Sequence, residues 1–294
     1  MDVTQIIVDG VLLGGIYALL GIPLNLLFGT TRIIHFAYGE FLMLGMYGAL
    51  ILFRHTGLDP YEGGVLVMVP VFVLIGVAAY WLLFRWIAEK PYTIQIIATL
   101  GFGIALSNLA LMVESANVQT VRTAVSGSSV EVLGVLLPTT RLIGFGGALL
   151  IALLLAAFLR YSFWGSGMRA LTQSKLGAEV VGIPVPRVHQ VAVVVTTVLT
   201  GVSGALLLPI FTVFPTVGAD FAVIAFVVVV LGGMGSIYGG LIAAAVIGLV
   251  QSFSAATLGV HWETVSYFLI FILVLLVRPA GIAGKRGTEL LGHE

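Results

Sequence analysis

Ionisable and aromatic side chains gather in one short stretch of this chain, Arg32-Ile33-Ile34-His35-Phe36-Ala37-Tyr38-Gly39-Glu40-Phe41, between two apolar runs. His35, Tyr38 and Glu40 are the side chains there that can exchange a proton or hydrogen-bond to a polar solute. His35 does not predict a metal site, because no second histidine or carboxylate stands at ligand spacing from it. Glu40 either supports the local structure or contacts a solute directly.

A second irregular stretch lies in the other half of the chain, at Gly232-Gly233-Met234-Gly235-Ser236. Matching glycine-rich breaks in two halves are typical of transporters with internal repeats, whose substrate site lies at the repeat interface. The alternative is that these glycines only allow helices to pack closely. Taken together, the two breaks predict a solute pathway formed by His35, Phe36, Tyr38, Gly39, Glu40, Gly232, Gly233, Met234 and Gly235.

The segment 161–190 carries a third feature. Gly167-Met168-Arg169-Ala170 leads into residues 171–181, which combine helix-forming and charged residues, before Gly182 and Pro184 end the pattern. The pattern predicts one short amphipathic helix. It is either a linker at a membrane interface or a docking helix for a cytoplasmic partner.

An alternative function is that of an enzyme. Intramembrane serine proteases carry a motif similar to Gly201-Val202-Ser203-Gly204, and His261 follows this motif in the chain. Such chemistry needs a serine activated by a histidine on a facing helix. His261 instead falls next to Trp262 and Glu263, in a connecting segment. Packing of small residues therefore explains this stretch better than catalysis.

The composition indicates the class of protein that positions these residues. Only 9% of the 294 residues are charged, with 13 Lys and Arg against 13 Asp and Glu, and 60% are hydrophobic. Ordinary soluble domains carry roughly 25% charged residues. Together with a mean hydropathy of +1.16, this excludes an average soluble enzyme, a disordered chain and a nucleic-acid binder. Without cysteine, disulfides and thiolate chemistry are excluded as well.

Runs free of Asp, Glu, Lys and Arg cover residues 10–31, 41–53, 63–84, 91–113, 142–159, 191–219, 221–262 and 264–277. Since a membrane crossing needs about 20 apolar residues, most of these runs are single spans. Residues 33–53 form one span with Glu40 inside it, and residues 221–262 must break at Gly232–Ser236. The sequence thus predicts an all-α polytopic membrane protein of eight or nine transmembrane helices, with two halves related as an inverted repeat.

Basic residues gather in three connecting segments, at Arg85 and Lys90, at Arg160, Arg169, Lys175 and Arg187, and at Arg278, Lys285 and Arg286. Placing all three in the cytoplasm puts the loop 114–141 and the N-terminus outside. Nine crossings satisfy this orientation, whereas a re-entrant 221–233 segment would give eight and place the tail outside. Asp2 and Asp9 replace the basic residues of a signal peptide, so we expect the N-terminal run to be a membrane helix.

Several motifs carry a family resemblance along nearly the whole chain. Permease subunits of branched-chain amino acid ABC importers carry Asn-Phe-Ala-His-Gly-Glu after their first span, and this chain reads His35-Phe36-Ala37-Tyr38-Gly39-Glu40. Their late Gly-Gly-Met/Ile-Gly-Ser-Ile motif corresponds to Gly232-Gly233-Met234-Gly235-Ser236-Ile237. Thr99-Leu100-Gly101 and Arg278-Pro279-Ala280-Gly281-Ile282 also fit in order and spacing. The chain therefore resembles this family from residue 1 to residue 294, as a single transmembrane permease domain.

The resemblance implies a multi-pass protein of the bacterial inner membrane that works with a second permease subunit, two cytoplasmic ATPase subunits and an external solute-binding protein. The family's Arg-Ala…Ala-x-x-x-Gly-Ile pattern implies contact with the ATPase through Arg169, Ala170, Ala178, Gly182 and Ile183. ATP would bind to the partner subunits, because no GxxxxGK[ST] pattern occurs here. The chain would hold no cofactor and catalyse no covalent step.

Two departures leave the transported solute open. The family's asparagine is His35 in this chain, and its histidine is Tyr38. The resemblance therefore implies transport of a branched-chain amino acid, another small amino acid or a related small polar solute. An ion-coupled secondary transporter or channel is the alternative function, and it would use Glu40 and Asp220 as its relay.

The orientation can be tested with single cysteines, because the chain has no native cysteine. Ser128→Cys should react with a membrane-impermeant maleimide added to intact cells, since the loop 114–141 is expected outside. Lys175→Cys should react only after the cells are opened. The opposite labelling pattern would reverse the orientation.

Overall fold

The computed structural model describes residues 3–114, 116–132 and 134–284, and most of these residues are helical. Among them, seven helices are long and apolar enough to cross a membrane, which confirms an all-α polytopic membrane fold. They are Val3–Thr31, Pro60–Ile87, Tyr92–Glu114, Thr139–Tyr161, Val185–Leu207, Ile237–Thr257 and Val260–Val277. Asp2, Lys285 and Arg286, which enter the predicted orientation, lie outside the described residues.

Along the chain the elements are α1 (Val3–Thr31), α2 (Tyr38–Thr56), α3 (Val65–Ala79), α4 (Arg85–Ile87), α5 (Tyr92–Glu114), β1 (Ser129–Val132), β2 (Val135–Pro138), α6 (Thr139–Tyr161), α7 (Phe163–Gln173), α8 (Lys175–Val180), α9 (Val185–Leu207), α10 (Val217–Gly232), α11 (Ile237–Thr257) and α12 (Glu263–Val277). Two π-helical turns, Pro60–Gly64 and Tyr80–Phe84, precede and follow α3 in one continuous helix that ends with α4. A 3-10 turn, Val260–Trp262, precedes α12. The predicted break in the long run 221–262 is confirmed, since α10 ends at Gly232 and α11 begins at Ile237.

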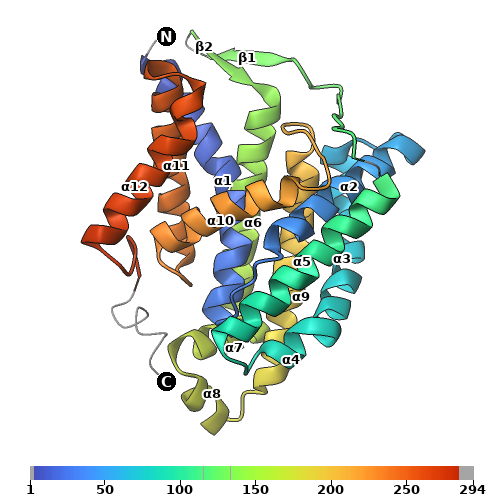
Figure 1. Ribbon diagram of the computed structural model, residues 1–294, viewed down its shortest axis with the longest axis vertical. Helices are drawn as coiled ribbons and strands as arrows, with labels where there is room; N and C mark the ends of the chain where they lie inside the picture. The colour runs from blue at the N-terminus through green and yellow to red at the C-terminus, as the bar shows by residue number, and fades with distance from the viewer. Residues whose placement is uncertain (1–2, 115, 133, 285–294) are drawn as a thin grey trace.

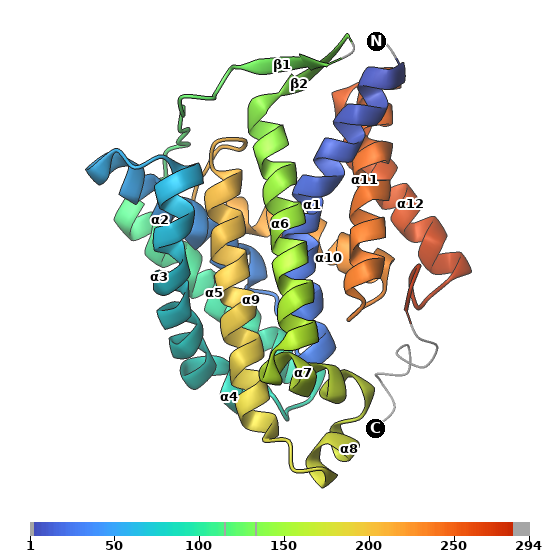
Figure 2. The ribbon, with the colours of Figure 1, turned by 180° about the vertical axis from the view of Figure 1, so that it is seen from behind.

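Helix α1 passes through the centre of the molecule, with α6, α9, α10 and α11 around it (Figures 1 and 2). Its apolar residues are not confined to one face, and they are buried along most of its length. Glycines bring α11 close to it: a Cβ on Gly14 would lie 2.8 Å from the Cα of Ala245, and one on Gly10 2.8 Å from that of Leu249. Small residues thus allow the two backbones to touch.

Pro23 lies inside α1 and has no N–H to donate to the carbonyl group four residues earlier, that of Leu19. The Ser203 hydroxyl of α9 donates to that carbonyl oxygen at 3.1 Å and so replaces the missing donor. Ser203 is completely buried. Its place beside a proline-freed carbonyl gives Ser203 a structural role.

Helix α2 crosses α9 and α10 at glycines. A Cβ on Gly204 would overlap the Leu42 carbonyl oxygen of α2, and one on Gly45 would lie 2.9 Å from the Cα of Gly201. At the start of α2, a Cβ on Gly39 would overlap the carbonyl oxygen of Gly218, in the first turn of α10. The N-terminal ends of α2 and α10 therefore meet backbone to backbone.

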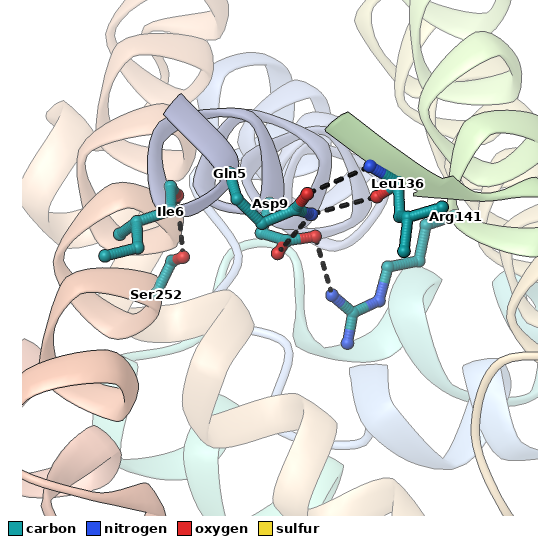
Figure 3. A network of polar contacts seen from close by, with 6 residues as sticks. All are labelled: Gln5, Ile6, Asp9, Leu136, Arg141 and Ser252. Atoms are coloured by element: carbon teal, nitrogen blue, oxygen red, sulfur yellow. Dashed lines mark hydrogen bonds and ion pairs between the residues drawn. The ribbon is translucent and has the colours of Figure 1, made fainter. Parts of the chain in front are cut away.

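We call the end of the molecule that carries the β1–β2 hairpin the outer end, and the end that carries α7 and α8 the inner end (Figure 1). At the outer end, the Gln5 side chain both accepts from the N–H of Leu136 at 3.0 Å and donates to its carbonyl at 2.9 Å. Asp9 accepts from Gln5 at 3.0 Å and pairs with Arg141 at 3.6 Å (Figure 3). These contacts attach the loop 114–141 to the first turns of α1.

The contact between Gly39 and Gly218 can be tested by stability. In Gly39→Ala the added methyl group would overlap the Gly218 carbonyl oxygen, so the purified protein should lose roughly 1–3 kcal/mol and melt at a lower temperature. Gly146→Ala is the control, because Gly146 also lies in a helix and has no atom within 4 Å of its Cβ position. Gly146→Ala should be at least as stable as the parent. Equal melting temperatures for the two variants would contradict the contact.

Candidate functional site

The connection between α1 and α2 is not helical, and side chains of α5 take up its backbone groups. Gln95 accepts from the N–H of Ile34 at 3.3 Å, and the Thr99 hydroxyl accepts from that of Phe36 at 3.2 Å. Gln95 and Thr99 are 3% and 0% exposed, so this backbone is buried in protein. The irregular stretch is therefore compatible with membrane depth because its hydrogen bonds are satisfied inside the chain.

The structure places His35 and Tyr38 in the core. His35 is 4% exposed, and its ring makes edge contacts with Phe41 and Phe84 at centroid distances of 5.2 and 4.9 Å. Its Nδ1 has no hydrogen-bond partner among the described residues. Tyr38 is completely buried. Neither side chain is accessible to a solute in this structure.

Phe36, Gly39 and Glu40 lie next to α5 and α10. Phe36 stacks on Phe226 of α10 at 4.7 Å, and a Cβ on Gly103 of α5 would lie 3.2 Å from the Glu40 carboxyl group. The Glu40 Oε2 atom is buried without a hydrogen-bond partner among the described residues. An unpaired carboxylate oxygen is costly inside a protein, so Glu40 is the unusual group of this stretch.

Asp220 is the counterpart of Glu40 on α10. Each carboxylate lies in the first turn of its helix, where a negative charge is favoured by the helix dipole. The two helices touch at Gly39 and Gly218, one and two positions before these acids. Asp220 is exposed, whereas Glu40 is half-buried. The structure thus brings two acidic residues to one crossing point.

The second predicted stretch, Gly232–Gly235, packs elsewhere. Gly233 and Gly235 have φ values of 99° and 84°, which favour glycine. The N–H of Gly235 donates to the Asn25 side chain of α1 at 3.1 Å. Met234 and Gly235 line a cavity with Arg32, and a Cβ on Gly235 would lie 3.0 Å from the Cα of Gly29. The break between α10 and α11 therefore packs against the last turns of α1.

The chain segment after α12 caps the C-terminal end of α10. The N–H of Ile282 donates to the Leu231 carbonyl at 2.8 Å, and that of Ala283 to the Gly232 carbonyl at 3.0 Å. A Cβ on Gly281, whose φ is 79°, would lie 2.6 Å from the Gly233 nitrogen. These bonds satisfy carbonyl groups that the end of a helix leaves free. They give the Arg278–Ile282 motif a structural role.

The prediction of one helix in the segment 167–184 is wrong, because the segment forms two helices, α7 and α8. Ser174, with φ −159° and ψ 118°, stands between them and accepts the N–H of Gly177 at 3.0 Å. A serine that caps the second helix ends the first one. Gly182 (φ 82°) follows α8, and the N–H of Ile183 donates to the Ala178 carbonyl at 3.0 Å.

The five residues assigned to ATPase contact differ in exposure. Arg169 and Gly182 are exposed, Ala170 and Ile183 are half-buried, and Ala178 is 2% exposed. Sequence reasoning missed the apolar surface beside them, formed by Leu176, Val180 and Val181, which are 72%, 78% and 73% exposed. We name these three residues the α8 apolar patch. A sequence signal existed, since they are apolar residues within a charged connecting segment.

Ser203 and His261 do not form a catalytic pair. Ser203 is buried between α9 and α1 and donates to the Leu19 carbonyl. His261 is exposed in the turn before α12. The geometry lacks the serine–histidine hydrogen bond that nucleophilic catalysis needs.

The profile of the family described as "Branched-chain amino acid transport system / permease component" matches residues 6–278. The match begins in the first turns of α1 and ends just after α12, so it includes both irregular stretches as well as α7 and α8.

Individual relatives are similar over the same length. The high-affinity branched-chain amino acid transport system permease protein LivH of Escherichia coli (strain K12) is 30% identical over 293 residues, covering 96% of this chain and 95% of LivH. BraD of Pseudomonas aeruginosa, with the same description, is 27% identical over 297 residues, covering 97% of each chain. A probable branched-chain amino acid transport permease protein, LivH of Methanocaldococcus jannaschii, is 25% identical over 314 residues, covering 97% and 94%. The chain therefore belongs to the family of permease components of branched-chain amino acid transport systems.

Proposed function

We propose that this chain is the membrane-spanning subunit of an ATP-driven importer that moves branched-chain or other small amino acids into the cytoplasm. The observation that carries the proposal is the family match over residues 6–278, together with relatives that are similar from end to end. We assign to the complex a second permease subunit, two ATPase subunits that bind ATP, and an external solute-binding protein. We assign the chain to a bacterial-type plasma (inner) membrane, which it would cross several times.

We infer nine membrane crossings, with α2 and α10 added to the seven long helices. Helix α2 starts inside the molecule, where Gly39 meets Gly218 of α10, and reaches the outer end, where Arg54 pairs with Glu114 of α5 at 3.2 Å. Helix α10 starts after Val213, which is bonded to Gln119 of the outer loop at 2.9 Å, and its last carbonyls bind the segment after α12. Its 16 residues span about 24 Å, which is less than the roughly 30 Å of a bilayer core. Helix α10 therefore starts below the outer surface, and the segment before it completes the crossing.

An inverted repeat accounts for the meeting of α2 and α10. In each half a long helix, α1 or α9, is followed by an irregular segment and a shorter helix. The long helices run in opposite directions, and the two shorter helices meet at Gly39 and Gly218 (Figure 1). Discontinuous helices that meet at a repeat interface mark the solute site in several transporter folds. We therefore place the pathway at this crossing, beside Glu40.

The face that carries the crossing has room for a second permease subunit. Figure 1 shows α10 in front of α1, between α5 and α12. Both flanking helices are mostly uncovered, and Phe36, Phe226 and Glu40 of the crossing are only half-buried. A second subunit on this face would enclose a path along α10 that has mostly apolar walls. Such walls hold a zwitterionic amino acid weakly, which allows passage.

We assign the α8 apolar patch to the ATPase. Leu176, Val180 and Val181 are exposed at the inner end, next to the ion pair between Lys175 and Glu89. Exposed apolar residues in a polar surrounding mark protein contacts. Because α7 also packs against α1 and α9, a push on α8 would reach the core of the chain.

A double variant, Leu176→Ser/Val180→Ser, tests this docking. Both side chains are exposed, so the melting temperature of the isolated chain should not change, whereas co-purification with the ATPase and ATP-driven uptake should fall roughly tenfold. Glu179→Gln is the control on the same helix, because Glu179 is also exposed. Full uptake by the double variant would exclude the patch from the docking surface.

The role of Glu40 is tested with Glu40→Gln, which removes the charge and keeps the shape. If the carboxylate faces the pathway, uptake per assembled complex should fall roughly tenfold while the amount of complex and its melting temperature stay unchanged. Glu62→Gln, at an exposed position of the helix before α3, is the control. A lower melting temperature with unchanged uptake per complex would show a purely structural role.

Uptake by the reconstituted protein distinguishes ATP-driven transport from ion-coupled transport. Uptake by the complex should require ATP and stop when the ATPase subunits are left out. Uptake by the chain alone, driven by an ion gradient and lost in Glu40→Gln and Asp220→Asn, would identify an ion-coupled transporter instead.

A further inference from the structure

A cavity of about 480 Å³ opens at the inner end, between the last turns of α1, helix α7 and the break between α10 and α11. Its polar lining comes from α1 and α7, with Asn25, Thr30, Arg32, Arg169 and Thr172, together with the residues that begin α11. Neither an aspartate nor a glutamate is among the described residues that line it. The cavity is therefore positively charged on the part of the chain that the structure describes.

Arg32 has an unusual backbone at the edge of this cavity. It is the single residue other than glycine with a positive φ, 56°, in residues 3–114, 116–132 and 134–284. Its N–H donates to the Phe28 carbonyl at 2.9 Å, so it ends α1 in a conformation that usually selects glycine. Residues with a strained backbone cluster at functional sites. Arg32 combines such a backbone with a charged side chain at the edge of a cavity. The backbone fixes the exposed side chain at the end of α1.

Arg169 approaches the cavity from α7. Its guanidinium donates to the Ser166 hydroxyl at 3.3 Å. Within the described ranges, the ion pairs of the chain are made by Arg54, Arg141 and Lys175, and neither Arg32 nor Arg169 takes part in one. Two guanidinium groups thus border one cavity without a carboxylate from the described residues.

Helix α11, of 21 residues, begins at the same cavity. Ser236 caps it by accepting from the N–H of Gly239, but the N–H groups of Ile237 and Tyr238 have no acceptor among the described residues. The start of a helix carries a partial positive charge and free donors. Asn25, completely buried and also part of the lining, has an Nδ2 atom without a partner in the described part of the chain.

We propose that this cavity binds a phosphate group. Paired guanidinium forks and the start of a helix are the donors that proteins use for phosphate oxygens. An amino acid zwitterion fits less well, because its ammonium group would find no carboxylate among the described lining residues. The phosphate can come from the headgroup of an anionic phospholipid or from free phosphate. A lipid is favoured by the apolar part of the lining, which includes Phe28, Leu159 and Met234.

Bound phosphate would join three elements, the end of α1, helix α7 and the start of α11. Of these, α7 belongs to the segment proposed to receive the push of the ATPase. Occupancy would therefore favour the arrangement in which the three elements lie together. The ligand would regulate the transporter without lying on the solute pathway at Glu40.

The site is tested on the purified full chain in a neutral detergent, without the ATPase, so the result does not depend on which solute is carried. Native mass spectrometry measures binding of phosphatidylglycerol and of phosphatidylcholine with the same acyl chains. Thermal unfolding is then measured in sodium phosphate and in sodium chloride at equal ionic strength. The compared variants are Arg32→Gln/Arg169→Gln and a control, Arg160→Gln/Arg187→Gln, which removes the same charge from exposed inner-end residues that do not line the cavity.

We expect phosphatidylglycerol to bind more tightly than phosphatidylcholine, and the Arg32→Gln/Arg169→Gln variant to weaken its binding roughly tenfold or more. The control should change binding less than about threefold. Stabilisation by phosphate over chloride that only Arg32→Gln/Arg169→Gln abolishes, without preference for phosphatidylglycerol, would identify free phosphate as the source. Equal loss of binding in both double variants would overturn the proposal. So would the absence of both effects, a preference for phosphatidylglycerol over phosphatidylcholine and a stabilisation by phosphate over chloride. If the double variant does not fold, Arg32→Lys replaces it: it keeps the charge, loses the fork and should bind more weakly.

Discussion

The central helix α1 must find partners for its backbone groups inside the protein, and the arrangement of the other helices depends on this. Pro23 frees a carbonyl group at Leu19, and Ser203 of α9 donates to it. Where α1 ends, Gln95 and Thr99 of α5 bind the backbone of the irregular segment. In a lipid environment no water would replace these partners, so α9 and α5 have to lie where they do.

Close approach of backbones is the second consequence of the same constraint. Glycines at the crossings of α1 with α11 and of α2 with α9 and α10 remove the side chains that would separate the helices. Apolar burial gives little drive for association between helices in lipid, so such packing and hydrogen bonds replace it. At Gly39 and Gly218 this packing also brings two helix starts together, with Glu40 and Asp220 in their first turns. One contact thus serves both the fold and the proposed pathway.

The candidate site was only partly predictable from the sequence. Irregular stretches at residues 32–41 and 232–236 were predicted from glycine and charge in apolar surroundings, and the structure has non-helical backbone at residues 32–37 and 233–236. Their grouping into one pathway does not follow, because periodicity cannot say which helices touch. His35 and Tyr38 are buried in the core, and Ala178 lies on the buried side of α8. Ser174 ends a helix that propensity alone would continue, since its hydroxyl competes for a backbone N–H.

The class of the protein follows from its sequence, because the low charge, the apolar runs and the ordered motifs indicate a polytopic helical permease whatever the packing. It also indicated the break between α10 and α11, because glycine acts locally, but not the break at Ser174. The packing of the helices brings Gly39 against Gly218 and places Arg32 and Arg169 in the lining of one cavity. Those contacts join segments far apart in the chain, and an apolar helix has no sequence pattern that identifies its neighbours.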